Sequence, residues 1–364
     1  MKKVGIITIY GNNNYGNKLQ NYAVQKTIEK LGNFSVETIK NYSTLNNRKR
    51  TIIDYLKTIK LFFINNVIEK TNGRYKYFSD FNQHINYTKT YFTFKDKKNK
   101  FKYDYLSIGS DQVWNPEYRF KDFDLGDFSD NDKIFSFSAS LSAENFPSYF
   151  RSDVVKKKLL TFKQISVREQ RGKELLEKLT GRKDIEVLVD PTMMLTTEEW
   201  DEVAKKPKQL KSDKYILNYF LGDLSNERRK EINRIALENK CTVINILDKN
   251  DPLYKTGPAE FLYLEKNAFL ICTDSFHSSV FALLYNRPFV IFDREYKNVR
   301  NMNSRFDTLI QKFKLKNRKF NGKITNENLN HDYSEAYKIL EEERNRTIAF
   351  LMNALDIKGS DKNE

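Results

Sequence analysis

The sequence has few of the residues that build covalent or metal-based sites. Its 364 residues include only two cysteines, Cys241 and Cys272, and both lie in or beside predicted core strands, so we expect reduced, buried thiols. None of the three histidines has a second His or Cys at the spacing of zinc ligands. There is no apolar run of about 18 residues and no GxSxG elbow. A disulfide scaffold, a zinc site, a membrane span and a Ser-His-Asp hydrolase are therefore excluded.

The first residues of the sequence do not have the pattern expected of a signal peptide. The apolar run at 4–9 follows Met1-Lys2-Lys3 directly, is too short for a signal peptide and has no cleavage site. Together with the reduced thiols, this predicts a cytoplasmic protein.

Positive charge is plentiful, with 63 Lys and Arg against 48 Asp and Glu and a formal net charge of +15. The clusters at 48–50, 95–102, 156–158 and 314–319 suit an anionic membrane surface, an anionic substrate or simply solvated faces. No helix-turn-helix, zinc or RNA-binding signature accompanies them, so we expect no nucleic-acid partner.

Strand-like runs alternate with helical runs along the chain, which is the pattern of parallel βαβ units. Two such sets are separated near Lys205, and a long apolar-faced helix follows at 333–355. We predict an α/β protein with two Rossmann-like domains, 1–205 and 206–332. Residues 333–364 would be a closing helix, packed back across both domains, with a polar tail. The cleft between the domains would hold the site.

The stretch from Ile271 to Ser279 is the most informative in the chain. It predicts a buried strand, a turn of small polar residues and a helix whose first turn carries His277. Ligands bind at the carboxyl ends of strands in α/β sheets, and helix N-termini attract anions. We predict that His277 transfers protons beside an anion site, with a purely structural histidine as the alternative.

Four other loops follow predicted strands and could face the same cleft. They are 11–20, which matches neither Walker A nor GxGxxG, then 107–115, 165–169 with Arg168, and 188–192 with Asp190. An arginine at a strand end can bind a carboxylate or phosphate. For each loop a structural explanation stays open: a strand–helix turn, an N-cap, a solvated arginine or a domain-boundary turn.

Taken together, these segments resemble the polysaccharide pyruvyl transferase family. Their order and spacing make the match specific, although each motif alone is weak. The matching segments are Asn13–Gln20, Gly109–Trp114, Ser166–Glu169, Val189–Thr192, Gly257–Phe261, Thr273–His277 and Asn303–Phe306.

The resemblance implies a GT-B-like fold and an enzyme that transfers pyruvate from phosphoenolpyruvate to a sugar, forming a ketal. Phosphoenolpyruvate would be a co-substrate, and we expect no cofactor and no metal, because a phosphate and a carboxylate call for cations and helix N-termini. His277 would be the acid/base group and Arg168 an anion clamp. Asp190, Asp274 and Gln20 would be structural or adjacent to the site. Donor contacts are expected from Ser275, Ser278, Asn14, Gly16, Asn17, Gly109, Ser110, Asp111, Lys255, Gly257 and Arg305.

The chain departs from the family pattern at one position. Better-studied members have Arg-Leu-His where this sequence has Ser275-Phe276-His277, so one donor-binding arginine is missing and Arg305 or Lys255 is the expected replacement.

The acceptor would be a sugar, or a lipid-linked oligosaccharide of a capsule or exopolysaccharide, at the inner membrane face. The resemblance is weakest over 45–100, where we expect acceptor selection. Apolar residues at 52–67 form one helical face beside basic residues, either an interfacial helix on an anionic membrane or a helix packed on its own domain. The alternative function is a GT-B glycosyltransferase that uses a nucleotide sugar.

Overall fold

The computed structural model describes residues 1–11, 13–40, 73–89, 103–117, 120, 122–128, 133–295 and 304–358. Several predictions lie outside these residues: the apolar face at 52–67, the basic clusters at 48–50 and 95–102, and Asn303. In the described part, no helix is both long enough and apolar enough to cross a bilayer.

The N-terminal half is built on a parallel sheet in the order β2-β1-β3-β4. Most residues of β1, β3 and β4 are buried, as expected for a parallel sheet covered on both faces, whereas β2 at the edge is partly exposed. A short parallel pair, β5-β6, continues from β4 through backbone bridges at Phe135–Gln164 and Ala139–Val167. The strands are β1 (Lys2–Ile7), β2 (Phe34–Thr38), β3 (Tyr105–Ile108), β4 (Ile134–Ser136), β5 (Ser166–Val167) and β6 (Glu186–Val187).

The C-terminal half repeats this architecture with a second parallel sheet, in the order β10-β9-β7-β8. The central strands β7 and β9 are buried along their whole length. The strands are β7 (Tyr215–Tyr219), β8 (Thr242–Asn245), β9 (Leu270–Thr273) and β10 (Phe289–Ile291).

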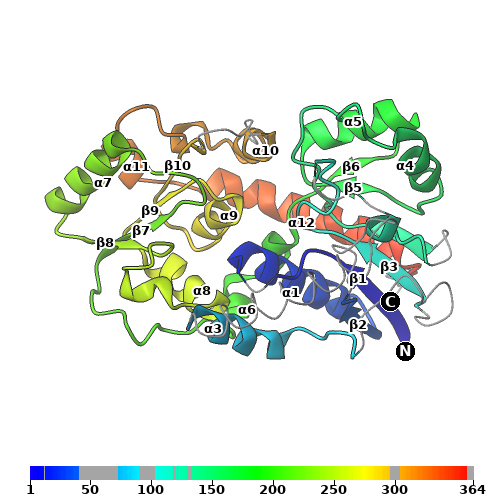
Figure 1. Ribbon diagram of the computed structural model, residues 1–364, viewed down its shortest axis with the longest axis horizontal. Helices are drawn as coiled ribbons and strands as arrows, with labels where there is room; N and C mark the ends of the chain where they lie inside the picture. The colour runs from blue at the N-terminus through cyan, green and yellow to red at the C-terminus, as the bar shows by residue number, and fades with distance from the viewer. Residues whose placement is uncertain are drawn as a thin grey trace, which may run out of the picture.

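Helices cover both sheets and connect the halves (Figure 1). In the N-terminal half these are α1 (Tyr15–Lys30), α3 (Arg74–Phe81), α4 (Ser152–Leu159) and α5 (Gln170–Thr180). The short helices η5 (Pro191–Met194) and α6 (Thr197–Asp201) lead to the C-terminal half, which carries η6 (Pro252–Tyr254), α7 (Asn226–Glu238), α8 (Pro258–Asn267), α9 (Phe276–Leu284), α10 (Ser304–Lys312) and α11 (Asn326–Leu329).

The long helix α12 (Ser334–Ala354) runs across both halves (Figure 1). Its Arg344 donates hydrogen bonds to the carbonyls of Met193 and Leu195, just after β6. Its apolar face joins Leu351 to the largest hydrophobic core, which also includes Leu19 and Ile271. The predicted closing helix is therefore confirmed. The domain boundaries placed near 205 and 332 stay predictions.

Candidate active site

The two halves meet where the N-termini of α1 and α9 face each other, after the carboxyl ends of β1 and β9. Gly16, in the first turn of α1, lies directly against the ring of His277, in the first turn of α9. A Cβ atom added to Gly16 would lie 2.1 Å from His277 Nδ1, so no side chain fits at this position. The histidine ring is thus held by contact with the other half of the molecule.

The other ring nitrogen of His277 faces a buried ion pair. Nε2 lies 3.4 Å from Arg168 Nη1 and 3.6 Å from Asp190 Oδ2. Arg168 follows β5 and Asp190 precedes η5, so both come from the N-terminal half. The predicted acid/base histidine and the predicted anion clamp are therefore neighbours.

Asp190 is the acidic centre of this cluster. Its Oδ2 accepts from Arg168 Nη1 at 2.5 Å and from Ser110 Oγ at 3.3 Å, while Oδ1 accepts from Thr192 N and Oγ1. Burial alone would raise the pKa of Asp190, but the charges of Arg168 and His277 outweigh it and hold the pKa well below its ordinary value. Asp190 is therefore a fixed anion that orients Arg168 and the ring of His277.

Asp111 is a second buried carboxylate beside the same groups. Its Oδ1 lies 3.5 Å from Arg168 Nη2, and its Oδ2 accepts a hydrogen bond from Asn17 Nδ2. Burial would raise the pKa of Asp111, yet His277, Arg168 and Arg305 together lower it. Asn17 and Asp111, predicted from separate motifs, are thus in direct contact.

Arg305, on α10, brings a second guanidinium to the cluster. The ring of Phe276 lies between the two arginines, with its centroid 4.4 Å from Arg168 Cζ and 5.9 Å from Arg305 Cζ. Burial and the neighbouring charge of Arg168 lower the pKa of Arg305 to about 10. Two buried guanidinium groups therefore lie close together at this point, and such groups can bind an anionic ligand.

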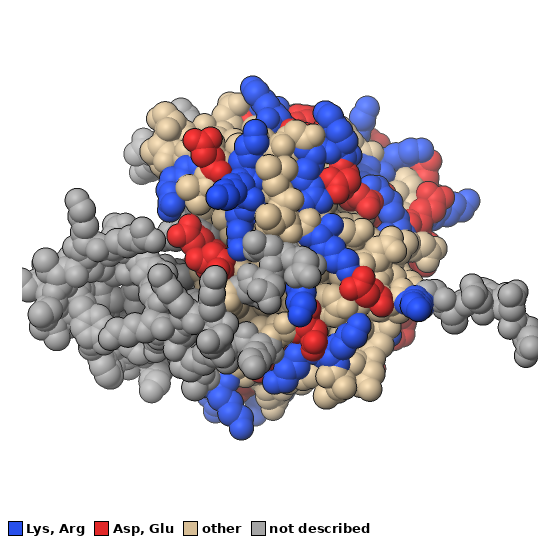
Figure 2. Space-filling view, turned by 90° about the vertical axis from the view of Figure 1, so that its right-hand side faces the viewer, with Lys and Arg blue, Asp and Glu red and all other residues tan. Residues whose placement is uncertain are grey.

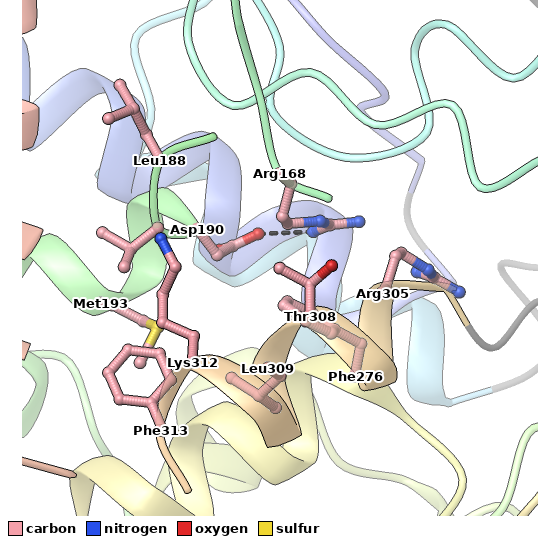
Figure 3. Close-up of a pocket in the computed structure, with 11 residues that line it drawn as sticks. Arg168, Leu188, Asp190, Met193, Phe276, Arg305, Thr308, Leu309, Lys312 and Phe313 are labelled. Carbon is pink, nitrogen blue, oxygen red and sulfur yellow. Dashed lines mark hydrogen bonds and ion pairs between the residues drawn. The ribbon is translucent and has the colours of Figure 1, made fainter. Parts of the chain in front are cut away.

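A small cavity of about 20 Å³ opens beside these groups, between η5 and α10. Its polar end is formed by Arg168, Asp190 and Arg305, and its far end by apolar side chains and Lys312. Figure 3 shows the two guanidinium groups pointing the same way, away from the apolar end.

The side chain of Gln20, on α1, fixes the loop after β3 through hydrogen bonds. Gln20 Oε1 accepts from Ser110 N, and Gln20 Nε2 donates to Thr8 Oγ1 and to the Asn17 carbonyl. Gly109 has φ +114°, and a Cβ there would lie 2.6 Å from the Phe137 carbonyl oxygen, so glycine is required. Gln20 and Gly109 thus act by shaping the loop that carries Asp111.

Other predicted residues lie at helix ends or in the core beside the helices. Asn14 caps α1 by accepting from Asn17 N, and Ser275 is the N-cap residue of α9. Ser278 donates to Glu265 in the core between α8 and α9. Asp274 accepts from the amides of Leu221 and Gly222, directly after β7.

Lys255 and Gly257 lie at α3, the packing partner of α8. The side chain of Lys255 runs along Gly73, at 3.3 Å from a Cβ built there. A Cβ at Gly257 would lie 2.6 Å from the Tyr77 carbonyl oxygen. Of the two expected replacements for the missing arginine, the fold brings Arg305, and not Lys255, to the cluster.

Sequence reasoning missed two supporting residues. Phe276 was noted only as a departure from the family pattern, but its ring contacts both arginines. Glu169 lies next to Arg168 in the same motif. It accepts from the amides of Leu141 and Ser142 and from Ser140 Oγ, which fixes the loop beneath the arginine. The adjacency of Glu169 to Arg168 was the available signal.

Within the described ranges, no group of three or more His, Cys, Asp or Glu side chains is arranged to hold a metal ion.

A sequence model of one family, described as polysaccharide pyruvyl transferase, matches residues 14–296. This range includes every segment of the cluster except α10. No curated protein matches the chain in sequence.

Solved structures resemble the whole chain at low identity. A UDP-N-acetylglucosamine 2-epimerase is 12% identical with a TM-score of 0.50, covering 100% of this chain and 98% of that one. The UDP-GlcNAc 2-epimerase from Neisseria meningitidis, bound to UDP-GlcNAc, is 9% identical with a TM-score of 0.48, covering 98% of this chain and 100% of that one. At such identity only the fold is shown, and it is the predicted GT-B-like arrangement of two Rossmann-like halves.

Proposed function

The chain belongs to the polysaccharide pyruvyl transferase family, and from this membership we propose that it moves pyruvate from phosphoenolpyruvate to a sugar of a lipid-linked cell-surface polysaccharide precursor. The observation that carries the proposal is the position of His277 Nε2, within 3.6 Å of both Arg168 and Asp190 and beside a second buried guanidinium, Arg305. A proton-transfer group next to paired cations suits a donor that carries two anionic groups.

Arg168 and Arg305 would bind the carboxylate and the phosphate of the donor. Their common orientation (Figure 3) and their mutual repulsion support this role, because an anion between them relieves the repulsion. Arginine forks match both carboxylate and phosphate geometry. The donor needs no further cofactor in this scheme.

His277 would move each proton of the reaction. The protonated ring gives a proton to C3 of phosphoenolpyruvate, and it recovers one from the first sugar hydroxyl as that oxygen bonds to C2. The C2–O bond to phosphate then breaks, phosphate leaves with the bonding electrons, and His277 protonates it. The second hydroxyl bonds to C2 and returns its proton to His277, which closes the ketal and restores the starting state.

Asp190 would keep the ring of His277 in place through these steps. Its Oδ2 faces both Arg168 and His277, at 3.6 Å from His277 Nε2, so the carboxylate can hold the ring in its position. Asp111 would fix the position of Arg168 from the other side.

The acceptor side would lie on the N-terminal half, and the lipid-linked precursor would bring the protein to the inner membrane face as a peripheral partner. Because the acceptor is not identified, the test uses lipid-linked saccharides extracted from the cells that encode the protein. Wild-type protein should release phosphate from phosphoenolpyruvate only when the extract is present, and mass spectrometry should find pyruvate on the sugar.

His277→Ala should abolish this release, and Arg168→Lys should raise the KM for phosphoenolpyruvate. Lys255→Ala, a cation at α3, is the matched control and should keep the wild-type KM. Sugar transfer from a nucleotide sugar with no use of phosphoenolpyruvate would overturn the proposal in favour of the glycosyltransferase alternative.

A further inference from the structure

Helix α4 and the residues on either side of it expose large apolar side chains. The outer face of a helix that contacts only water is usually polar. Five large hydrophobic residues are exposed in the described part of the chain, and three of them belong to this short region. They are Tyr149, Val154 and Leu160, with 69%, 43% and 48% of their surface exposed. The opposite side of α4 packs inward through Val155 and Leu159, so the exposed set forms an outer face.

Basic side chains lie among these apolar groups. Lys157 lies between Val154 and Leu160 at helical spacing, with Lys156 beside it, and both lysines are exposed. Over 149–163 there are five Lys or Arg and one Asp. Arg151 and Lys163 pair with Asp122 and Asp356, whereas Lys156 and Lys157 form no ion pair within the described ranges.

This face, which we call the α4 face (Tyr149, Val154, Lys156, Lys157 and Leu160), belongs to a helix that is separated from the candidate site by α5. Helix α5 packs against both α4 and α10, and α10 carries Arg305. Figure 2 views the molecule from the side that carries α4 and α5, and blue side chains outnumber red ones along its upper part.

We propose that the α4 face docks on an anionic lipid bilayer. Exposed aliphatic and aromatic groups can enter the headgroup region, while lysines at the same level bind anionic headgroups. Nucleic acid would use the lysines and leave Val154 and Leu160 in water, so the mixed character of the face favours lipid. The inference does not depend on which donor the enzyme uses, and it would place the cleft near a lipid-linked acceptor.

The experiment is flotation of the full-length protein with vesicles of phosphatidylcholine alone and of phosphatidylcholine with 30% phosphatidylglycerol. Wild-type protein should float with the anionic vesicles and much less with the neutral ones. Lys156→Glu/Lys157→Glu should weaken binding roughly tenfold or more, since each lysine near an anionic surface contributes on the order of 1 kcal/mol. Val154→Ser/Leu160→Ser should also weaken it.

Helix α7, at the far end of the other half, supplies matched controls. Arg229→Glu/Lys230→Glu changes the net charge equally, and Leu237→Ser removes an apolar group that is more exposed, at 81%, than Val154 or Leu160. Both controls should float like the wild type, and every variant should melt at the wild-type temperature.

Equal losses in the α4 and α7 variants would overturn the proposal, because net charge alone would then explain binding. Flotation that depends on the lysines but not on Val154 and Leu160, together with binding to duplex DNA of mixed sequence, would also overturn it in favour of a general polyanion surface.

Discussion

One of the contacts between the two halves at the candidate site is made by Gly16, which lies against the ring of His277. Because a Cβ there would come within 2.1 Å of Nδ1, Gly16→Ala must displace the ring from its present position beside Arg168 and Asp190. A displacement of about 1 Å can lower a rate on the order of a hundredfold, so we expect kcat to fall by about that factor. Phosphate release from phosphoenolpyruvate measures it.

Gly32→Ala is the control for this prediction, since the nearest atom to its Cβ belongs to the movable ring of Phe34 at 3.2 Å. It should keep nearly all activity. An active Gly16→Ala protein would show that the ring position does not matter.

The carboxylate of Asp190 should stabilise the fold as well as the site. Asp190→Asn keeps the hydrogen bonds to Thr192 but leaves Arg168 and His277 without their shared anion. Breaking a buried ion pair costs about 3–5 kcal/mol of unfolding free energy, measured by urea denaturation. Asp184→Asn, which breaks the exposed pair with Arg182, should cost less than about 1 kcal/mol. Equal costs in the two variants would contradict this reading.

At the scale of single residues, the sequence indicated which residue types belong to the candidate site better than it indicated which of them are in contact. Short strands come just before Arg168, Asp190 and His277 in the sequence. Parallel strands bring their carboxyl ends together at one edge of a sheet. Arg305 and Lys255 were equivalent candidates, because nothing in a local pattern tells which cation folds back to the cleft. Ser278 looked like a ligand for an anion, but one helical step turns it into the core toward Glu265.

At the scale of elements, a hydrogen bond to a buried carboxyl group joins α9 to α8. This carboxyl group has no ion-pair partner among the residues that the structure describes. Glu265 is fully buried, accepts from Ser278 Oγ, and burial raises its pKa well above the ordinary value. The folded state therefore keeps this proton at pH values where the unfolded chain has lost it. Stability from this group is complete below the pKa of the unfolded chain and is lost as pH rises toward that of the folded state.

Glu265→Gln should remove that pH dependence, because the amide is similar in size and carries no charge. We expect the variant to become progressively more stable than the wild type between pH 5 and pH 8, roughly, in urea denaturation. Glu227→Gln, an exposed position on α7, should follow the wild type throughout. Parallel curves for wild type and Glu265→Gln would show that Glu265 ionises freely in the fold.

The elements themselves were largely predictable. Strand-like runs alternating with helical runs predicted two sets of parallel strands, and the helix predicted at 333–355 spans Ser334–Ala354. The order of strands in each sheet was not predicted, because it depends on pairings between residues far apart in the sequence.

At the scale of the whole molecule, Tyr15 links the two halves. Its ring stacks on Phe78 and Phe261 with centroids 5.0 and 4.6 Å away, and its hydroxyl contacts Thr256. Tyr15→Ala should destabilise the protein by about 3–5 kcal/mol through the lost packing. Tyr15→Phe, which loses only the hydroxyl contact, should cost about 1 kcal/mol. Urea denaturation of both variants checks this, and a similar small cost in each would mean that the ring does not hold the halves together.

Such contacts between the halves could not be read from the sequence. Tyr15 and Phe261 are separated by most of the chain and come together only when both sheets have formed. The active site shares this property, because Gly16, Arg168 and Asp190 come from one half and His277, Phe276 and Arg305 from the other. The activity of this candidate site therefore depends on the relative position of the two halves.

The central claim is that this shared site binds phosphoenolpyruvate, and calorimetric titration tests it most directly. We predict that wild-type protein binds phosphoenolpyruvate, that Arg168→Ala and Arg305→Ala each weaken binding at least tenfold, and that Lys255→Ala does not. Saturable binding of UDP-GlcNAc by a protein that gives no heat with phosphoenolpyruvate would contradict the account.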